Sequence, residues 1–161
     1  LVDTEDVRKR MNEHMAEGME VLSVVVLPEK SGSAMAAVAA AGYYIAFRDD
    51  FEPPEGWREE IKEFLKADQI LVKKQTKKSV LQVDLKPSIY DFRLSSYQGK
   101  NCLYLMVNAS SARNIKPAMV MEALFNKLGI SFDASEMSVT REDTYRNRGT
   151  EEEPVFVPMD Q

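Results

Sequence analysis

One stretch of the sequence, residues 70–108, has the strongest strand signal of the chain and limits the folds available to it. Apolar and polar residues alternate over 81–85, as in a strand with one buried face. The alternation shifts by one residue after Pro87, and proline cannot donate a ladder hydrogen bond, so we expect a bulge at this proline. The pattern predicts a long antiparallel hairpin over 80–108.

The segments around this stretch alternate between helix and strand patterns. Amphipathic periodicity predicts helices over 57–68 and 117–128, and strands are predicted over 42–47, over 70–72 and within 130–140. The resulting order, strand, helix, strand, hairpin, helix, strand, is that of the ferredoxin-like arrangement. The predicted fold is therefore α+β: a ferredoxin-like antiparallel sheet with two helices on one face and a long bulged β-hairpin.

The sequence divides into three predicted parts. Residues 1–30 contain a helix capped by Thr4 and a strand over 20–27, which we interpret as the helix–strand remnant of an N-terminal subdomain. Residues 31–148 hold the ferredoxin-like α+β domain, and 149–161 form an acidic and apolar C-terminal tail. Because the first residue is leucine rather than methionine, we expect a fragment, a processed product or a trimmed chain.

Composition narrows the class of protein. With 161 residues, 44% hydrophobic and 29% charged, the chain has the composition of a globular domain. Its apolar runs fall short of the roughly 20 residues of a spanning helix, so we expect no membrane partner. The net charge of −5 argues against a generic nucleic-acid binder. A single cysteine, Cys102, excludes an internal disulfide and favours a reducing cytoplasm.

The sequence contains no recognisable catalytic constellation. Cys102 lies in the most apolar strand, where a packed core residue is the favoured interpretation. His14 is the single histidine, on an apolar helix face, so neither a Ser-His-Asp triad nor a His/Cys zinc site is expected. Phosphate loops of the GxxxxGK[ST] and GxGxxG types are absent. We predict no catalytic residue, no metal site and no cofactor.

Positive charge is concentrated in the central stretch. Residues 71–100 contain seven lysines and arginines but only two aspartates, which gives a local charge of +5. One interpretation is a phosphate-binding strip, because lysines beside a nucleic-acid backbone release counterions. The other, which we favour, is an exposed sheet edge that lysines protect against aggregation. The candidate RNA-binding residues are Lys73, Lys74, Lys77, Lys78, Lys86 and Arg93.

A second candidate cluster combines both signs of charge. Asp84 and Lys86 share the polar phase of one predicted strand, and we expect Arg93 and Arg141 to join them from neighbouring strands. Such a cluster is a candidate site for a polar ligand. A ladder of surface salt bridges, each worth less than about 1 kcal/mol, is the favoured alternative.

Several segments, taken in order, carry a family resemblance. They include MNEHMAEGMEVLSV, SAMAAVAAAGYYIAF, TKK…VDLKPSIYDFRL, KPAMVMEALF and VTREDTYR. Over about Arg8–Arg146 the chain resembles the radical-SAM-linked family of uncharacterised bacterial proteins. In that family the domain is free-standing or joined to the end of a radical-SAM protein. The family usually begins with a further segment, containing a basic helix and a GFNPHP-like loop, which this sequence lacks.

The resemblance implies association with a radical-SAM system and, through its typical gene setting, with RNA or translation. The chain is not the radical enzyme, whose cluster needs three cysteines, usually spaced CxxxCxxC. We therefore expect a cytoplasmic, non-catalytic accessory or binding module. One alternative is an RNA-binding module using the basic hairpin 73–93, although the aromatic pattern of such sheets is missing from the sequence. Another is an enzyme completed by the missing N-terminal segment. The expected partners are a radical-SAM protein, RNA or a second copy of the chain.

Overall fold

The chain forms two compact units, which are described separately. The computed structural model describes residues 2–27, 32–75 and 79–161. The first unit covers essentially residues 1–34 and the second residues 35–159. No helix in these described ranges has the length and apolar character needed to cross a membrane.

The first unit contains the helix α1 (Thr4–Asn12). Its N-cap is Asp3, one residue before the expected cap, because the Asp3 carboxylate accepts two backbone N–H groups of the first turn. The helix ends earlier than its apolar periodicity predicts. His14 consequently lies beyond the helix and is exposed, rather than on an apolar helix face.

The strand predicted over 20–27 is wrong for the described structure. A strand exists only through its ladder, and no other described segment pairs with these residues. The Asn12 side chain instead exchanges hydrogen bonds of 2.7 and 3.0 Å with the backbone of Val21. Five large apolar side chains over 19–27 are exposed: Met19, Leu22, Val25, Val26 and Leu27.

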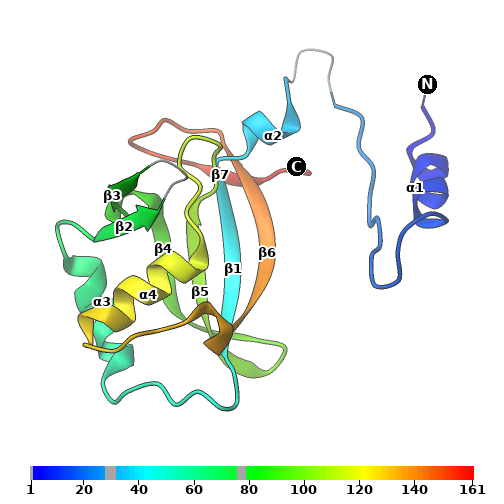
Figure 1. Cartoon of the computed structure of the whole chain (residues 1–161). Helices are drawn as coiled ribbons and strands as arrows, with labels where there is room; N and C mark the ends of the chain where they lie inside the picture. The colour runs from blue at the N-terminus through cyan, green and yellow to red at the C-terminus, as the bar shows by residue number, and fades with distance from the viewer. Residues whose placement is uncertain (1, 28–31, 76–78) are drawn as a thin grey trace. The chain divides into compact units, whose positions relative to one another are not determined.

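The second unit is built on one antiparallel sheet (Figure 1). After the short helix α2 (Ala34–Ala37), its strands run in the spatial order β4-β5-β1-β6-β7. Every neighbouring pair is antiparallel, which confirms the predicted α+β class with an antiparallel sheet. The strands are β1 (Ala40–Phe47), β4 (Ile89–Tyr97), β5 (Lys100–Asn108), β6 (Met137–Asn147) and β7 (Phe156–Pro158).

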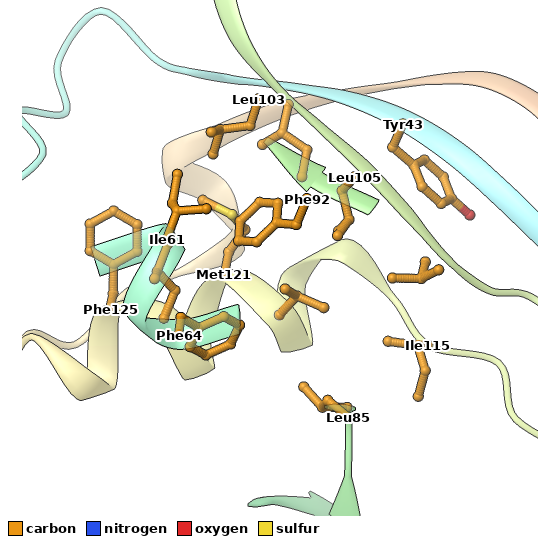
Figure 2. Close-up of a cluster of buried hydrophobic side chains, with 14 of the residues drawn as sticks. Tyr43, Ile61, Phe64, Leu85, Phe92, Leu103, Leu105, Ile115, Met121 and Phe125 are labelled. Carbon is orange, nitrogen blue, oxygen red and sulfur yellow. The ribbon is translucent and has the colours of Figure 1, made fainter. Parts of the chain in front are cut away.

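Two helices, α3 (Trp57–Lys66) and α4 (Pro117–Lys127), cover one face of this sheet. Figure 2 shows Ile61 and Phe64 of α3 and Phe125 of α4 among the buried side chains of the strands. The predicted apolar stripe of α3 is confirmed, because its Trp57, Ile61 and Phe64 are all buried. This layer forms the hydrophobic core of the unit.

The hairpin predicted over 80–108 is shorter than expected. The observed hairpin joins β4 to β5, whereas β3 (Val80–Asp84) pairs with β2 (Leu71–Gln75) in a separate two-stranded sheet. A 3-10 turn over Lys86–Ser88, containing Pro87, divides the two sheets. The expected bulge occurs just after this turn, at Tyr90, where the pairing of β4 with β5 shifts.

Asp84 fixes the base of the β2–β3 hairpin. Its Oδ1 accepts the backbone N–H of Ile70 at 2.8 Å and that of Lys86 at 3.0 Å, so the residues on either side of the hairpin are joined. Ile70 and Leu85 are buried in the core beside it. The two-stranded sheet is therefore anchored at its base.

The main sheet is curled. Tyr90 of β4 and Phe156 of β7 belong to strands at opposite edges of the sheet, yet their ring centroids lie 4.5 Å apart. Bulges at Tyr90 in β4 and at Glu142 in β6 increase the local twist of their strands. The face turned away from α3 and α4 is consequently concave.

We predict that Asp84→Ala destabilises the second unit by about 1–3 kcal/mol, because two backbone N–H groups lose a half-buried acceptor. Urea denaturation measures the change. Asp68→Ala, at a nearby exposed position, is the matched control and should stay near the parent value. Equal stability of the two variants would contradict the role given to Asp84.

Candidate functional site

The concave face of the sheet carries tyrosines from several strands. Tyr44 of β1 pairs with Tyr104 of β5, while the next pair, Ile45 and Leu103, points into the core on the opposite face. Tyr97, at the end of β4, joins them through ring contacts. We call this face, with Tyr44, Tyr97, Tyr104, Glu142 and Tyr145 as its defining residues, the trough.

The Tyr44 and Tyr97 rings are stacked. Their centroids lie 4.5 Å apart with an interplanar angle of 17°, and the Tyr104 ring is tilted against Tyr44 at 5.5 Å. A two-residue turn of Gln98 and Gly99, both with positive φ, closes the β4–β5 hairpin directly after Tyr97. Tyr97 is 37% exposed and Tyr44 is half-buried. The pair is an aromatic platform accessible from solvent.

Glu142 brings a carboxylate across the trough. It is the bulged residue of β6, and its Oε2 accepts the Tyr145 hydroxyl at 2.6 Å and the Tyr104 hydroxyl at 3.2 Å. A Cβ atom at Gly42 would lie 2.5 Å from this Oε2 and 2.6 Å from the Tyr104 hydroxyl. Because Gly42 has no side chain, the side chains of Glu142 on β6 and Tyr104 on β5 can meet above the backbone of β1.

Both tyrosines in this cluster stay protonated at neutral pH. Burial and the nearby Glu142 carboxylate raise the pKa of Tyr104 to about 12. Burial, followed by donation to Glu142, also raises the pKa of Tyr145. Each hydroxyl consequently donates its proton to Glu142 Oε2, whereas no described residue donates to Oε1.

Arg93 lies over the same cluster. Its guanidinium carbon is 4.6 Å from the centroid of the Tyr104 ring, and its Nε donates to Asp91 Oδ2 at 2.8 Å. The hydrogen bond to Asp91 raises the pKa of Arg93. The remaining guanidinium donors border the trough beside the Tyr104 ring.

Two hollows lie at the two ends of the trough. The first, of about 710 Å³, adjoins the Tyr44–Tyr97 stack, and Arg48, Lys100 and two aspartates are among its lining residues. The second, of about 430 Å³, adjoins the Tyr90–Phe156 contact and includes Arg113. An elongated ligand lying along β1 would reach both hollows.

The basic candidates from the sequence do not form a single surface among the described residues. Lys73 is exposed on β2, whereas Lys86 donates to the backbone oxygen of Leu65 near the end of α3. Arg93 belongs to the other sheet and lies in the trough. The side chain of Lys74 and all of Lys77 and Lys78 lie outside the described residues.

The mixed-charge cluster expected from Asp84, Lys86, Arg93 and Arg141 is not assembled. Asp84 and Lys86 make backbone hydrogen bonds at the base of the hairpin. Arg141 lies 5.6 Å from the centroid of Tyr43, whose ring belongs to the core side of β1. Arg93 projects from the opposite face, so these side chains have no common site.

The trough itself was missed by sequence reasoning. The strand that became β5 is apolar on both faces, which hides the alternation that places Tyr104 opposite its core neighbours. The available signal was the phase of Tyr44 and Tyr104 within their strands, each next to a buried apolar residue. That Tyr97, Tyr44 and Glu142 meet depends on pairing and bulges that no local pattern specifies.

Metal centres and a nucleophilic cysteine are the other kinds of site that the described residues could form. No group of three His, Cys, Asp or Glu side chains among them is arranged to hold a metal ion. Burial raises the pKa of the Cys102 thiol, which disfavours the nucleophilic thiolate at neutral pH. The arrangement is that of a binding surface made of rings, hydroxyl groups and a few charges.

We predict that Glu142→Gln lowers the pKa of Tyr104 from about 12 towards the ordinary value of 10.0, because a neighbouring negative charge is removed. Because the folded-state pKa is raised, the protonated Tyr104 contributes to folding stability fully below pH 10, and this contribution is lost as the pH rises towards 12. The Glu142→Gln variant should lose less stability over this pH range. Absorbance titration of tyrosinate, with Tyr104→Phe to assign the signal, checks the shift. An unchanged titration curve would be inconsistent with the charge contact.

Comparison with known proteins places the chain in a family. A family model described as "Uncharacterized protein conserved in bacteria (DUF2344)" matches residues 1–117. Searches of curated proteins and of solved structures found no match. Because the matched region covers most of the sequence, the chain belongs to this family of uncharacterized bacterial proteins.

Proposed function

We propose that this chain is a non-catalytic binding module that holds single-stranded RNA in its trough. The observation that carries the proposal is the stacked Tyr44–Tyr97 pair beside a hollow of about 710 Å³, on the sheet face that α3 and α4 leave uncovered. Stacking of a base on an aromatic ring contributes about 1–3 kcal/mol per base and tolerates any sequence. The site therefore has the chemistry of a stacking platform.

We also propose that β4-β5-β1-β6, with α3 and α4, is a ferredoxin-like unit. In this interpretation the β2–β3 hairpin is an insertion between α3 and β4, and β7 is an addition at one edge. The strand order and the position of both helices on one face support it. Sheets of this kind bind RNA through aromatic rings on their inner strands, where Tyr44 and Tyr104 lie.

The dimensions of the trough suit a short segment of RNA. The eight residues of β1 span roughly 25 Å at about 3.3 Å per residue. Hollows at both ends, with rings and hydroxyl groups between them, provide room for a few nucleotides. An extended strand along β1 is the ligand shape that fits.

Charge around the trough is nearly balanced. Arg48, Lys100 and Arg113 border the hollows, but Asp49 and Asp50 lie beside the first of them. Few phosphate contacts mean little counterion release, so the affinity should fall only gently with salt. This differs from the steep dependence that a lysine-rich hairpin would produce.

Replacing the platform tests the proposal. We predict that Tyr44→Ala and Tyr97→Ala each weaken the binding of oligouridine RNA by about 1–3 kcal/mol, measured by fluorescence anisotropy. Tyr44→Phe and Tyr97→Phe keep the rings and should bind nearly as well as the parent.

Lys73→Glu, an exposed change on the separate hairpin, is the charge control and should leave affinity unchanged. Circular dichroism confirms that each variant is folded. Undiminished binding by both folded alanine variants, or a loss in Lys73→Glu alone, would refute the trough as the RNA site.

We further propose that the module presents RNA to a radical-SAM protein in the cytoplasm. The family resemblance supplies this partner class, and the β2–β3 hairpin supplies a surface. Leu71 and Val80, which lie on one face of the hairpin, are each about half exposed, and exposed apolar side chains that share a face are typical of interaction sites. An apolar contact should persist at high salt.

We predict that the double variant Leu71→Glu, Val80→Glu loses co-elution with the purified radical-SAM protein of the same organism in size-exclusion chromatography. RNA binding in the trough should be retained, because the hairpin forms a separate sheet. Absence of a complex with the parent chain at any salt concentration would end this second proposal and leave the first intact.

A further inference from the structure

We propose that Glu142 makes the trough selective for guanine over uracil, an inference that rests on the proposed binding of RNA there. Two groups that contact the Tyr104 side chain carry this inference. One is the Glu142 carboxylate, which has an unused oxygen, and the other is the Arg93 guanidinium.

The Glu142 carboxylate lies in the middle of the trough. It passes above Gly42 of β1 to reach the hydroxyl of Tyr104 on β5. The Tyr104 ring in turn lies 5.5 Å from Tyr44, a member of the stacking platform. A base that lies beside Tyr104, at the inner side of the platform, is therefore next to the carboxylate.

One oxygen of Glu142 is available to a ligand. A carboxylate has about four acceptor positions, two on each oxygen. Tyr104 and Tyr145 fill the two positions of Oε2, whereas no described residue donates to Oε1 and the Glu142 side chain is exposed. Because two tyrosines already hold the carboxylate, little side-chain freedom is lost when a ligand binds.

Guanine matches this arrangement better than the other bases do. Its Watson–Crick edge presents two adjacent donors, N1–H and the N2 amino group, with the O6 acceptor beside them. Glu142 Oε1 accepts from the donors, and the free guanidinium donors of Arg93 suit O6. Uracil presents a single N–H between two carbonyl oxygens, and these oxygens are repelled by a carboxylate.

Oligouridines with one central substituted position test the selectivity. Guanosine, inosine, adenosine, cytidine and uridine are compared by fluorescence anisotropy with the whole chain. We expect guanosine to bind about tenfold more tightly than uridine. Inosine, which lacks the N2 amino group, should fall between the two.

The variant Glu142→Gln should lose the guanosine preference, measured as the ratio of the guanosine to the uridine affinity. Glu59→Gln, an exposed change on α3, is the matched control and should keep this ratio. Equal binding of all five RNAs by the parent chain, or an undiminished preference in Glu142→Gln, overturns the inference.

The outcomes separate this inference from the function on which it rests. If the parent binds all five RNAs equally but Tyr44→Ala and Tyr97→Ala bind weakly, the trough is an RNA site without guanine selectivity. If those tyrosine variants bind as the parent does, the proposed function fails and the selectivity fails with it.

Discussion

The arrangement of the concave face depends on the absence of a side chain at position 42. There β1 is the middle of three strands, and side chains from both neighbours meet above its backbone. Tyr104 is only 8% exposed, and a buried hydroxyl needs a hydrogen-bond partner. Glu142 reaches it from β6 only because no Cβ atom blocks the path across Gly42. The glycine at position 42 is therefore what permits the hydrogen bond between Tyr104 on β5 and Glu142 on β6.

The two faces of the sheet differ in composition: one is apolar and covered by helices, and the other carries aromatic and polar groups. On one face, α3 and α4 bury the apolar residues of the strands, and this layer supplies the stability of the second unit. On the other face, bulges at Tyr90 and Glu142 curl the strands until Tyr90 meets Phe156 from the opposite edge. The curl surrounds polar and aromatic groups with protein and leaves a hollow at each end. The larger hollow adjoins the Tyr44–Tyr97 stack.

Local patterns predicted the elements well and their partners less well. The helix with the Trp57 stripe and the helix beginning at Pro117 formed as expected, because each carries its own periodicity and boundary signals. The strand expected over 20–27 did not form, because a strand also needs a ladder partner. Lysines close in sequence and Arg93 were expected to act together, yet Arg93 and Lys73 belong to separate sheets. The trough depends on register and bulges, so its residues, far apart in the chain, gave no joint signal.

The fastening of the β2–β3 hairpin by Asp84 has a practical consequence. Its carboxylate joins the residues that flank the hairpin, so Ile70 and Lys86 are held together independently of the ladder between β2 and β3. The β2–β3 ladder can therefore open locally without separating its two ends, while the trough on the other sheet keeps its form.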